Sequence, residues 1–357
     1  MAPHPAADGS RARLAESSAA VAPMISVVIP ARNEEHTIGA CLRALHRQSV
    51  GCERMEVIVV AAGDDGTGDV AVREGEDQFG RFEIVRLTAG NKNAALRVGC
   101  ASAKGQMLVL LDADTELAPD AVAELLRAVH HPPHTAAHGA MVPRITTWVS
   151  RYCALNRRLM KDLRFDGQLS GGVIALPRAG LRPDDLRELF SGGVPAADDY
   201  QLTVALRQRG WHIAYAPAAV GKTLFPWTLR GLFVSMLRIR RGMMAALPLA
   251  DAALQAGKSA VLLLALPGAV GTAPRSAGLA MLCLAPLLLH ISVLSWRVAA
   301  LRQRGLGDYR TALPALVALD LLGRSLKLWA FVERLLGRRA QLTFRGERPE
   351  TAPAPDA

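Results

Sequence analysis

The sequence predicts an α/β fold with a mostly parallel sheet, followed by helices of membrane-like composition. Between residues 25 and 215, short apolar runs alternate with segments of helical spacing, which is typical of parallel strands covered by helices on both faces. Beyond Pro217, apolar segments alternate with clusters of Arg. A chain of 357 residues is long enough for one large domain or two smaller ones, with a sizeable core.

The α/β region begins with a strand at 25–30, which is apolar and stops at Pro30. The next segment, 35–48, places Ile38, Leu42 and Leu45 on one helical face. A strand at 56–60 ends in a Gly- and Asp-rich turn, which is typical of an entry into a helix. Further strands are expected at 82–87, 107–111, 139–143, 173–176 and 211–215, and further helices at 69–74, 93–103, 116–130, 148–166 and 197–209.

The C-terminal third predicts attachment to a membrane. Residues 225–241 combine Trp, Phe and Leu with Arg, the composition of a helix that lies in a bilayer interface. Residues 278–296 carry no charge over about the 20 residues that a spanning helix needs; the alternative is a buried core helix. Residues 259–271 are apolar but shorter, so they either span or re-enter. The apolar and basic stretch 311–336 is expected to be interfacial.

These segments divide the chain into five expected regions. They are a disordered tail at 1–22, an α/β domain at 23–224, interfacial amphipathic helices at 225–257, a transmembrane hairpin at 258–299, and an interfacial helix with a basic tail at 300–357. The base of the hairpin carries more Arg than its link. The positive-inside rule then predicts a multi-pass protein of the cell membrane with its α/β domain in the cytoplasm.

Charge and composition narrow the range of partners. The 42 Lys and Arg exceed the 32 Asp and Glu by 10, which suits a nucleotide, a nucleic acid or an acidic membrane surface. Aromatic residues make up 5% of the chain, too few for the stacking surface of single-strand binders, so no nucleic acid is expected.

The five cysteines lack metal-site spacing and are expected in the core. The histidine-rich stretch 130–138 could ligate zinc, but its two prolines favour a surface loop.

The strongest chemical signal is the acid pair Asp112 and Asp114, directly after the apolar run 107–111. Residues two apart on a strand or its extension point to the same side. Both carboxylates are therefore expected at the carboxyl end of a buried strand, where open α/β sheets bind ligands. A cation would relieve their repulsion, and oxygen ligands suit Mg²⁺ or Mn²⁺. The alternative is a solvated turn or a helix N-cap.

Six segments, in this order, resemble the membrane-associated glycosyltransferases of family 2. They are residues 28–35, 63–67, 91–96, 112–114, 170–172 and 198–202. The resemblance extends over about residues 24–245 and implies a GT-A nucleotide-diphospho-sugar-binding fold. It further implies an inverting transfer of a sugar from a nucleotide-diphospho-sugar to a hydroxyl acceptor, with Mg²⁺ or Mn²⁺ bound.

The resemblance assigns donor binding mainly to the first half of the chain. Pro30, Ala31 and Glu34 would line the nucleoside. Either Asp64 or Asp65 would contact the base or ribose, because the first acid of the family's usual turn is displaced here, and this leaves the nucleotide open. The alternative for this turn is a helix cap.

Further residues are assigned to the diphosphate and the metal. Lys92 opens a helix and would contact the diphosphate. Asp112 would face the ribose or sugar, and Asp114, with Asp112, would hold the metal. Arg238 matches the arginine of a Gln-x-x-Arg-Trp motif. Either Arg238 or Arg240 would touch the diphosphate; the alternative is an arginine that faces lipid headgroups. The Gln and Trp are absent, which argues against a processive polymer synthase.

On the acceptor side, Asp199 matches the family's general base. Asp198, in place of the usual Glu, and Ser170, Gly171 and Gly172 would lie near the acceptor, with helix capping and a plain turn as alternatives. Interfacial helices beside the site predict a lipid or amphiphilic acceptor. Two other functions remain: a polyprenyl-phosphate sugar transferase of the same fold, which would need no hydroxyl base, and a catalytically silent membrane partner that binds nucleotide.

Overall fold

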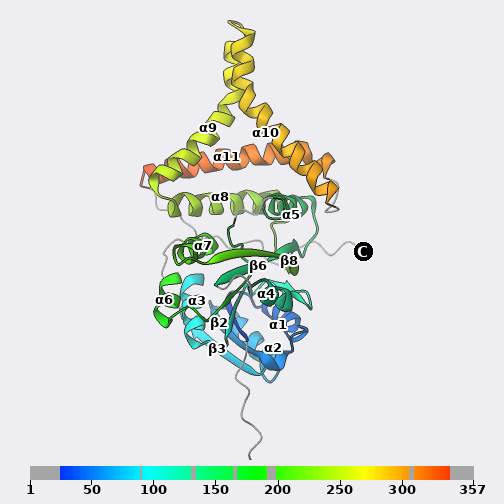
Figure 1. The fold of residues 1–357 in the computed structure, drawn as a ribbon, viewed down its shortest axis with the longest axis vertical. Coiled ribbons are helices and arrows are strands. Elements are labelled where there is room, and N and C mark those ends of the chain that lie inside the picture. The colour runs from blue at the N-terminus through cyan, green and yellow to red at the C-terminus, as the bar shows by residue number, and fades with distance from the viewer. Residues whose placement is uncertain are drawn as a thin grey trace, which may run out of the picture.

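The structure, a computed structural model, is an α/β unit that carries a layer of long helices on one side (Figure 1). It describes residues 25–88, 91–129, 134–163, 167–190, 198–304 and 309–337. The predicted tail at 1–22, the histidines His130 and His131, and the basic tail beyond residue 337 lie outside these residues.

One eight-stranded sheet forms the centre of the described α/β unit, in the order β3-β2-β1-β4-β7-β6-β8-β5. Its strands are β1 (Ile25–Arg32), β2 (Met55–Ala62), β3 (Arg81–Leu87), β4 (Met107–Leu111), β5 (Glu116–Leu117), β6 (Thr135–Pro143), β7 (Val173–Pro177) and β8 (His212–Thr223). The helices of this unit are α1 (Ile38–His46), α2 (Thr67–Gly75), α3 (Lys92–Ser102), α4 (Ala121–Val129), α5 (Trp148–Lys161), α6 (Pro183–Leu189) and α7 (Asp198–Gln208), with short 3₁₀ turns at Cys52–Arg54 and, farther along the chain, Arg310–Ala312.

The sheet is parallel in its first half and mixed in its second half. Strands β3, β2, β1 and β4 are all parallel, as the alternation of strands and helices predicts. Strand β7 is antiparallel to both β4 and β6, β6 is parallel to β8, and β5 is antiparallel to β8. Four of the seven strand pairings among the described residues are therefore parallel, so the sheet is mostly parallel as predicted, with antiparallel pairings confined to its second half. The chain enters β7 beside the carboxyl end of β4, where Val173 pairs with Leu111, and runs back along it.

The central strands are buried on both faces, which explains their uninterrupted apolar sequences. Val27 and Ile29 of β1 belong to a core built with α1 and α4, whereas Val28 belongs to a second core built with α3 and α7. All three side chains are fully buried. The predicted stripe of Ile38 and Leu42 on α1 lies in the first core.

Several element boundaries differ from the predictions for physical reasons. The helix expected at 116–130 begins at Ala121, because Glu116 and Leu117 pair with β8 as the short strand β5. Strand β8 continues past Pro217 to Thr223, since a register shift opposite Gly139 accommodates the proline. Helix α6 has no counterpart among the predicted elements.

The C-terminal layer consists of four helices: α8 (Leu229–Ala246), α9 (Leu249–Thr272), α10 (Ala277–Gln303) and α11 (Leu313–Leu335). Figure 1 shows α8 lying beside α5 across the α/β unit, α11 crossing beyond α8, and α9 and α10 converging to an apex. Leu155 and Leu159 of α5 pack with Val298 and Leu301 of α10. Side-chain packing therefore ties the helical layer to the α/β unit.

Among the described helices, α9 and α10 are long and apolar enough to cross a membrane, judged by length and composition. Their most apolar windows have mean hydropathies of 1.4 and 2.2, and 22% and 0% of these windows are buried. They contain the apolar segments predicted at 259–271 and 278–296. The division expected between residues 257 and 258 falls inside α9, because this helix is continuous from Leu249.

Candidate active site

The carboxyl end of β4 and the loop that leads into β7 form the base of the candidate site. Asp112 follows β4 directly, and its backbone N–H donates to the carbonyl of Gly172 at 2.9 Å. This hydrogen bond continues the antiparallel ladder in which Leu111 pairs with Val173. Sheet pairing therefore holds the acid after β4 beside the glycines that precede β7.

Lys92 joins three segments of the site through ion pairs. Its Nζ lies 2.7 Å from Oδ1 of Asp112 and 3.0 Å from Oδ2 of Asp198. Lys92 is the first residue of α3, whose N-cap Asn91 accepts the N–H of Ala94 at 2.9 Å. Burial alone would lower the pKa of Lys92, but the two carboxylates raise it. Burial would likewise raise the pKa of Asp198, yet Lys92 holds it below its usual value. A cation at a helix N-terminus is suited to phosphate.

Asp199 is oriented by the loop before β7. Its Oδ2 accepts the N–H of Gly171 at 3.1 Å. Thr203 fixes α7 against the same loop, because its hydroxyl donates to the carbonyl of Asp199 at 2.7 Å and accepts the N–H of Leu169 at 3.0 Å. Burial, followed by the negative charge of Asp198, raises the pKa of Asp199. A fixed carboxylate with a raised pKa is suited to accepting a proton.

Gly171 and Gly172 allow the backbone to pass close to the carboxylates. Gly172 has φ +109°, and a Cβ there would lie 2.4 Å from Sδ of Met141. At Gly171, a Cβ would lie 3.7 Å from Oδ2 of Asp112 and 3.8 Å from Oδ2 of Asp199. A side chain at position 171 would therefore enter the space between the two acids. The pocket at this point is lined by Lys92, Leu96, Leu110, Leu111, Asp112, Gly171, Gly172, Ile174, Phe190, Asp198, Asp199 and Leu202.

Asp114 and Glu34 add further carboxylates near Asp112. Asp114 accepts hydrogen bonds from the hydroxyls of Thr223 at 3.2 Å and Thr115 at 3.3 Å. Burial, followed by the charge of Asp112, raises the pKa of Asp114 to about 6. Burial, with smaller effects of Asp114 and Asp112, raises the pKa of Glu34 to about 7. Negative charge is therefore in excess at this end of the sheet.

Asp112 and Asp114 fit a divalent cation, because excess negative charge on oxygen ligands is what Mg²⁺ and Mn²⁺ prefer. Within the described part of the chain, no group of three or more His, Cys, Asp or Glu side chains is placed to hold a metal ion. The described residues would therefore supply two carboxylate ligands to the metal ion, and oxygens of a bound ligand would fill its other coordination positions. The described histidines of the 130–138 stretch pack on aromatic rings, His134 on Trp211 and His138 on Tyr215.

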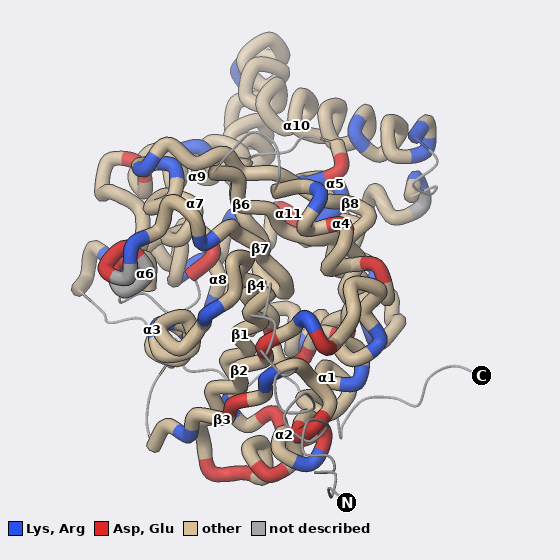
Figure 2. The backbone as a smooth tube through the Cα atoms, turned by 60° about the horizontal axis from the view of Figure 1, so that its bottom comes forward, with Lys and Arg blue, Asp and Glu red and all other residues tan. Residues whose placement is uncertain are grey.

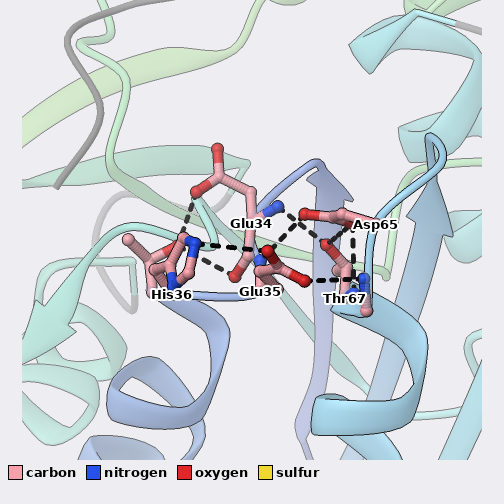
Figure 3. Close-up of polar contacts among 7 residues, drawn as sticks. Glu34, Glu35, His36, Asp65 and Thr67 are labelled. Atoms are coloured by element: carbon pink, nitrogen blue, oxygen red, sulfur yellow. Dashed lines mark hydrogen bonds and ion pairs between the residues drawn. The ribbon is translucent and has the colours of Figure 1, made fainter. Parts of the chain in front are cut away.

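The turn after β2 holds Asp65 by hydrogen bonds (Figure 3). Both oxygens are engaged: Oδ1 accepts the N–H of Thr67 at 3.1 Å, and Oδ2 accepts the N–H of Glu35 at 3.2 Å. Asp65 therefore stabilises the turn that leads into α2, whose N-cap residue is Gly66. Asp64 is exposed, and its backbone N–H donates to Oδ1 of Asn33 at 3.2 Å.

The remaining predicted site residues lie outside the pocket lining. Pro30 and Ala31 are in β1, and Ala31 is 2% exposed within the core; any contact of residue 31 with a nucleoside would come from its backbone. Ser170 is buried next to Gly171. Arg238 is exposed on α8.

Arg157 of α5 is a functional candidate that the sequence patterns do not single out. Its guanidinium carbon lies 5.1 Å from the centre of the Phe225 ring. Burial lowers the pKa of Arg157, while the carboxylates of Asp199 and Asp112 act to raise it, so the side chain is within electrostatic reach of both acids. The helical spacing of 148–166 predicts a basic helix but not which of its arginines interacts with the acids of the site.

Comparison with known proteins identifies the α/β unit. Residues 26–190 match the family model described as glycosyl transferase family 2. This part of the chain, residues 26–190, is similar to the family 2 glycosyltransferases. The match begins in β1, includes the acids after β4 and the glycine loop, and ends at the carboxyl end of α6. The resemblance predicted from the sequence is thereby confirmed for residues 26–190.

The curated relatives of this chain are distant in sequence. An N-acetylglucosaminyltransferase of Bradyrhizobium diazoefficiens is 27% identical over 256 residues, which cover 66% of this chain and 52% of that protein. The probable glycosyltransferase YdaM of Bacillus subtilis is 27% identical over 235 residues, covering 62% and 55%. The chain therefore spans about half the length of the curated relatives it matches.

A solved structure shows the same fold. The mannosyltransferase PcManGT from Pyrobaculum calidifontis, in complex with GDP-Man and Mn²⁺, superimposes with a TM-score of 0.56 at 18% identity. The match covers 89% of this chain and 88% of that one. The GT-A fold expected from the sequence is confirmed, with the mixed sheet described above.

Proposed function

We propose that this glycosyltransferase moves a sugar from a nucleotide-diphospho-sugar to a hydroxyl acceptor, with inversion at the anomeric carbon. The supporting observation is the pocket shared by Lys92, Asp112 and Asp199. Lys92 supplies positive charge for a diphosphate, and Asp199 supplies a carboxylate with a raised pKa. An inverting transfer needs both kinds of group within one hollow.

Asp199 is assigned to the acceptor. The acceptor oxygen forms a bond to the anomeric carbon while the bond from that carbon to the diphosphate oxygen breaks, and the hydroxyl proton passes to Asp199. Because its pKa is raised, Asp199 is a stronger base than an exposed carboxylate. The N–H of Gly171 fixes the direction of its Oδ2. Asp198 and the 170–172 loop are assigned to the same side.

Lys92 and Arg157 are assigned to the leaving group. Both cations lie within reach of Asp112 and would stabilise the charge that develops on the diphosphate. Asp112 and Asp114 would hold Mg²⁺ or Mn²⁺, which when bound neutralises the diphosphate as a Lewis acid. On the nucleoside side we retain Glu34 and Pro30, with Asp64 or Asp65 as the acid that contacts the base or ribose.

The acceptor is assigned to a lipid or amphiphile at the cytoplasmic face of the cell membrane. Leu282 and Trp296 of α10 are each 70% exposed, and the apex of the hairpin is almost free of charged residues (Figure 2). Exposed apolar surface of this extent indicates contact with lipid. Arg297 and Arg302 lie near the base of the hairpin, whereas its link carries Arg275, and by the positive-inside rule the base is cytoplasmic.

The test uses the full chain in a non-ionic detergent with UDP-, GDP- and TDP-sugars. Thermal stabilisation by one donor in the presence of Mn²⁺ identifies the nucleotide. Transfer is then measured with that donor, Mn²⁺ or EDTA, and either lipid-linked or soluble hydroxyl acceptors. We expect EDTA to abolish transfer and only lipid or amphiphilic acceptors to be glycosylated. Transfer confined to soluble acceptors would refute the membrane acceptor, and stabilisation by no donor would refute the enzyme.

A further inference from the structure

A stripe of charged side chains runs along one face of α11 at the base of the hairpin. Asp320, Arg324 and Lys327 are spaced four and three residues apart, which places them on one side of the helix. Nε of Arg324 lies 2.7 Å from Oδ2 of Asp320. The same oxygen lies 2.9 Å from Nε2 of His290 on α10. Nζ of Lys327 lies 3.4 Å from Oε1 of Gln255 on α9, so three helices meet at this stripe.

Arg240 of α8 enters the same region. A Cβ at Gly323 of α11 would lie 3.3 Å from one of its terminal nitrogens. Its Nε is buried and forms no hydrogen bond to the described residues, and its Nη1 donates to Sδ of Met243 at 3.9 Å. The adjacent Arg241, by contrast, makes two hydrogen bonds to Glu333, at 2.7 and 2.6 Å.

Positive charge is in excess in this α8–α11 cation cluster, defined as Arg240, Arg324 and Lys327. Burial lowers the pKa of Lys327 to about 8, and the charges of Arg240 and Arg324 act in the same direction. Asp320 is the carboxylate that opposes them in the described residues. A cation withdrawn from water without a counter-ion is unfavourable, so the cluster is incomplete without an anion.

We propose that the α8–α11 cation cluster binds the anionic phosphate of a lipid headgroup. Figure 1 shows α8 and α11 at the base of the α9–α10 hairpin, which is the depth of the headgroups if the hairpin is inserted. Arginine and lysine are the side chains that bind phosphate at that depth. This inference rests on the proposed membrane placement but not on the transfer reaction.

The test measures thermal unfolding of the full chain in non-ionic detergent. Dioleoyl phosphatidic acid, phosphatidylglycerol, phosphatidylcholine or inorganic phosphate is added in turn. The two anionic lipids are expected to raise the midpoint by about 5 °C, and phosphatidylcholine and inorganic phosphate by less than half as much. Equal effects of phosphatidylcholine, or an effect of inorganic phosphate as large as that of the lipids, would overturn a lipid headgroup as the ligand.

Variants separate a ligand site from a structural contact. Arg240→Met removes a buried charge while Asp320 keeps Arg324 and His290, so its midpoint without lipid is expected to equal or exceed that of the wild type. Its lipid-induced shift should fall at least threefold, as should that of Lys327→Met.

Arg230→Met removes the same charge from an exposed position on α8 and should leave the shift unchanged. A wild-type shift in Arg240→Met and Lys327→Met, or an equal loss in Arg230→Met, contradicts the proposal. Because no transfer is measured, an absence of enzyme activity does not affect this result.

Discussion

The pocket beside β4 and the α8–α11 cation cluster both gather charges in partly buried positions, but their charge balance is opposite. Near the pocket, Asp112, Asp198 and Asp199 share the cation Lys92, with Asp114 close by. In the helical layer, three cations share one carboxylate. The two clusters therefore suit two different ligands. The acid-rich pocket suits a sugar donor bound together with a divalent cation, and the cation cluster suits an anion at the base of the hairpin.

The largest expected effect comes from the acid-rich side. Asp199→Asn keeps an oxygen that can accept the N–H of Gly171 but removes the base. We expect the rate of transfer to fall by about 10²–10⁴-fold with little change in donor affinity, measured as kcat and donor KM. Asp77→Asn, an exposed acid in a left-handed conformation that Asn also adopts, is the matched control. Full activity in Asp199→Asn would favour a transfer that needs no hydroxyl base.

The next effect tests the shared cation. Lys92→Gln leaves Asp112 and Asp198 facing each other without their counter-ion. We expect the rate of transfer to fall by about 10²-fold, together with a weaker affinity for the nucleoside diphosphate measured by calorimetry. Lys104→Gln, an exposed lysine beyond the other end of α3, is the control. A loss in Lys92→Gln that affects kcat but not diphosphate binding would restrict Lys92 to positioning the carboxylates.

Much of the acid-rich pocket could be predicted from local sequence, whereas the base-rich cluster could not. The run 107–111 followed by Asp112 and Asp114 carries its own signal, because a buried strand ending in acids is a local pattern. The contact of Gly171 with Asp199 depends on α7 packing beside the antiparallel strand β7, and no local pattern reports strand direction. Arg157 and Arg240 resemble other arginines of their helices in sequence and differ from them only in what they face after packing.

A smaller effect is expected for the arginine that stacks on Phe225. Arg157→Gln removes a guanidinium that stacks on Phe225 and acts on Asp199 and Asp112. We expect kcat to fall about tenfold, and the pKa of the acidic limb of the kcat profile, assigned to Asp199, to rise because a nearby positive charge is lost. The control is Arg151→Gln, an exposed arginine of the same helix. An unchanged profile in Arg157→Gln would place Arg157 outside the electrostatics of the pocket.

The smallest effect concerns folding stability and tests the raised pKa of Glu34. Burial raises the pKa of Glu34 from 4.5 to about 7, so between these pH values the folded state binds more protons than the unfolded state. The free energy of unfolding must then decrease as pH rises from about 5 to 8.

Glu34→Gln retains an acceptor for the hydroxyl of Thr37 and removes this titration. At pH 8 it should be more stable than the wild type by about 1–3 kcal/mol, and at pH 4 the difference should vanish. Glu53→Gln, at an exposed position, should follow the wild type. If Glu34 instead has an ordinary pKa in the folded protein, the wild type and Glu34→Gln will show the same pH dependence in chemical unfolding. Mn²⁺ should reduce the difference at pH 8, because a cation beside Asp112 and Asp114 relieves the repulsion that Glu34 experiences.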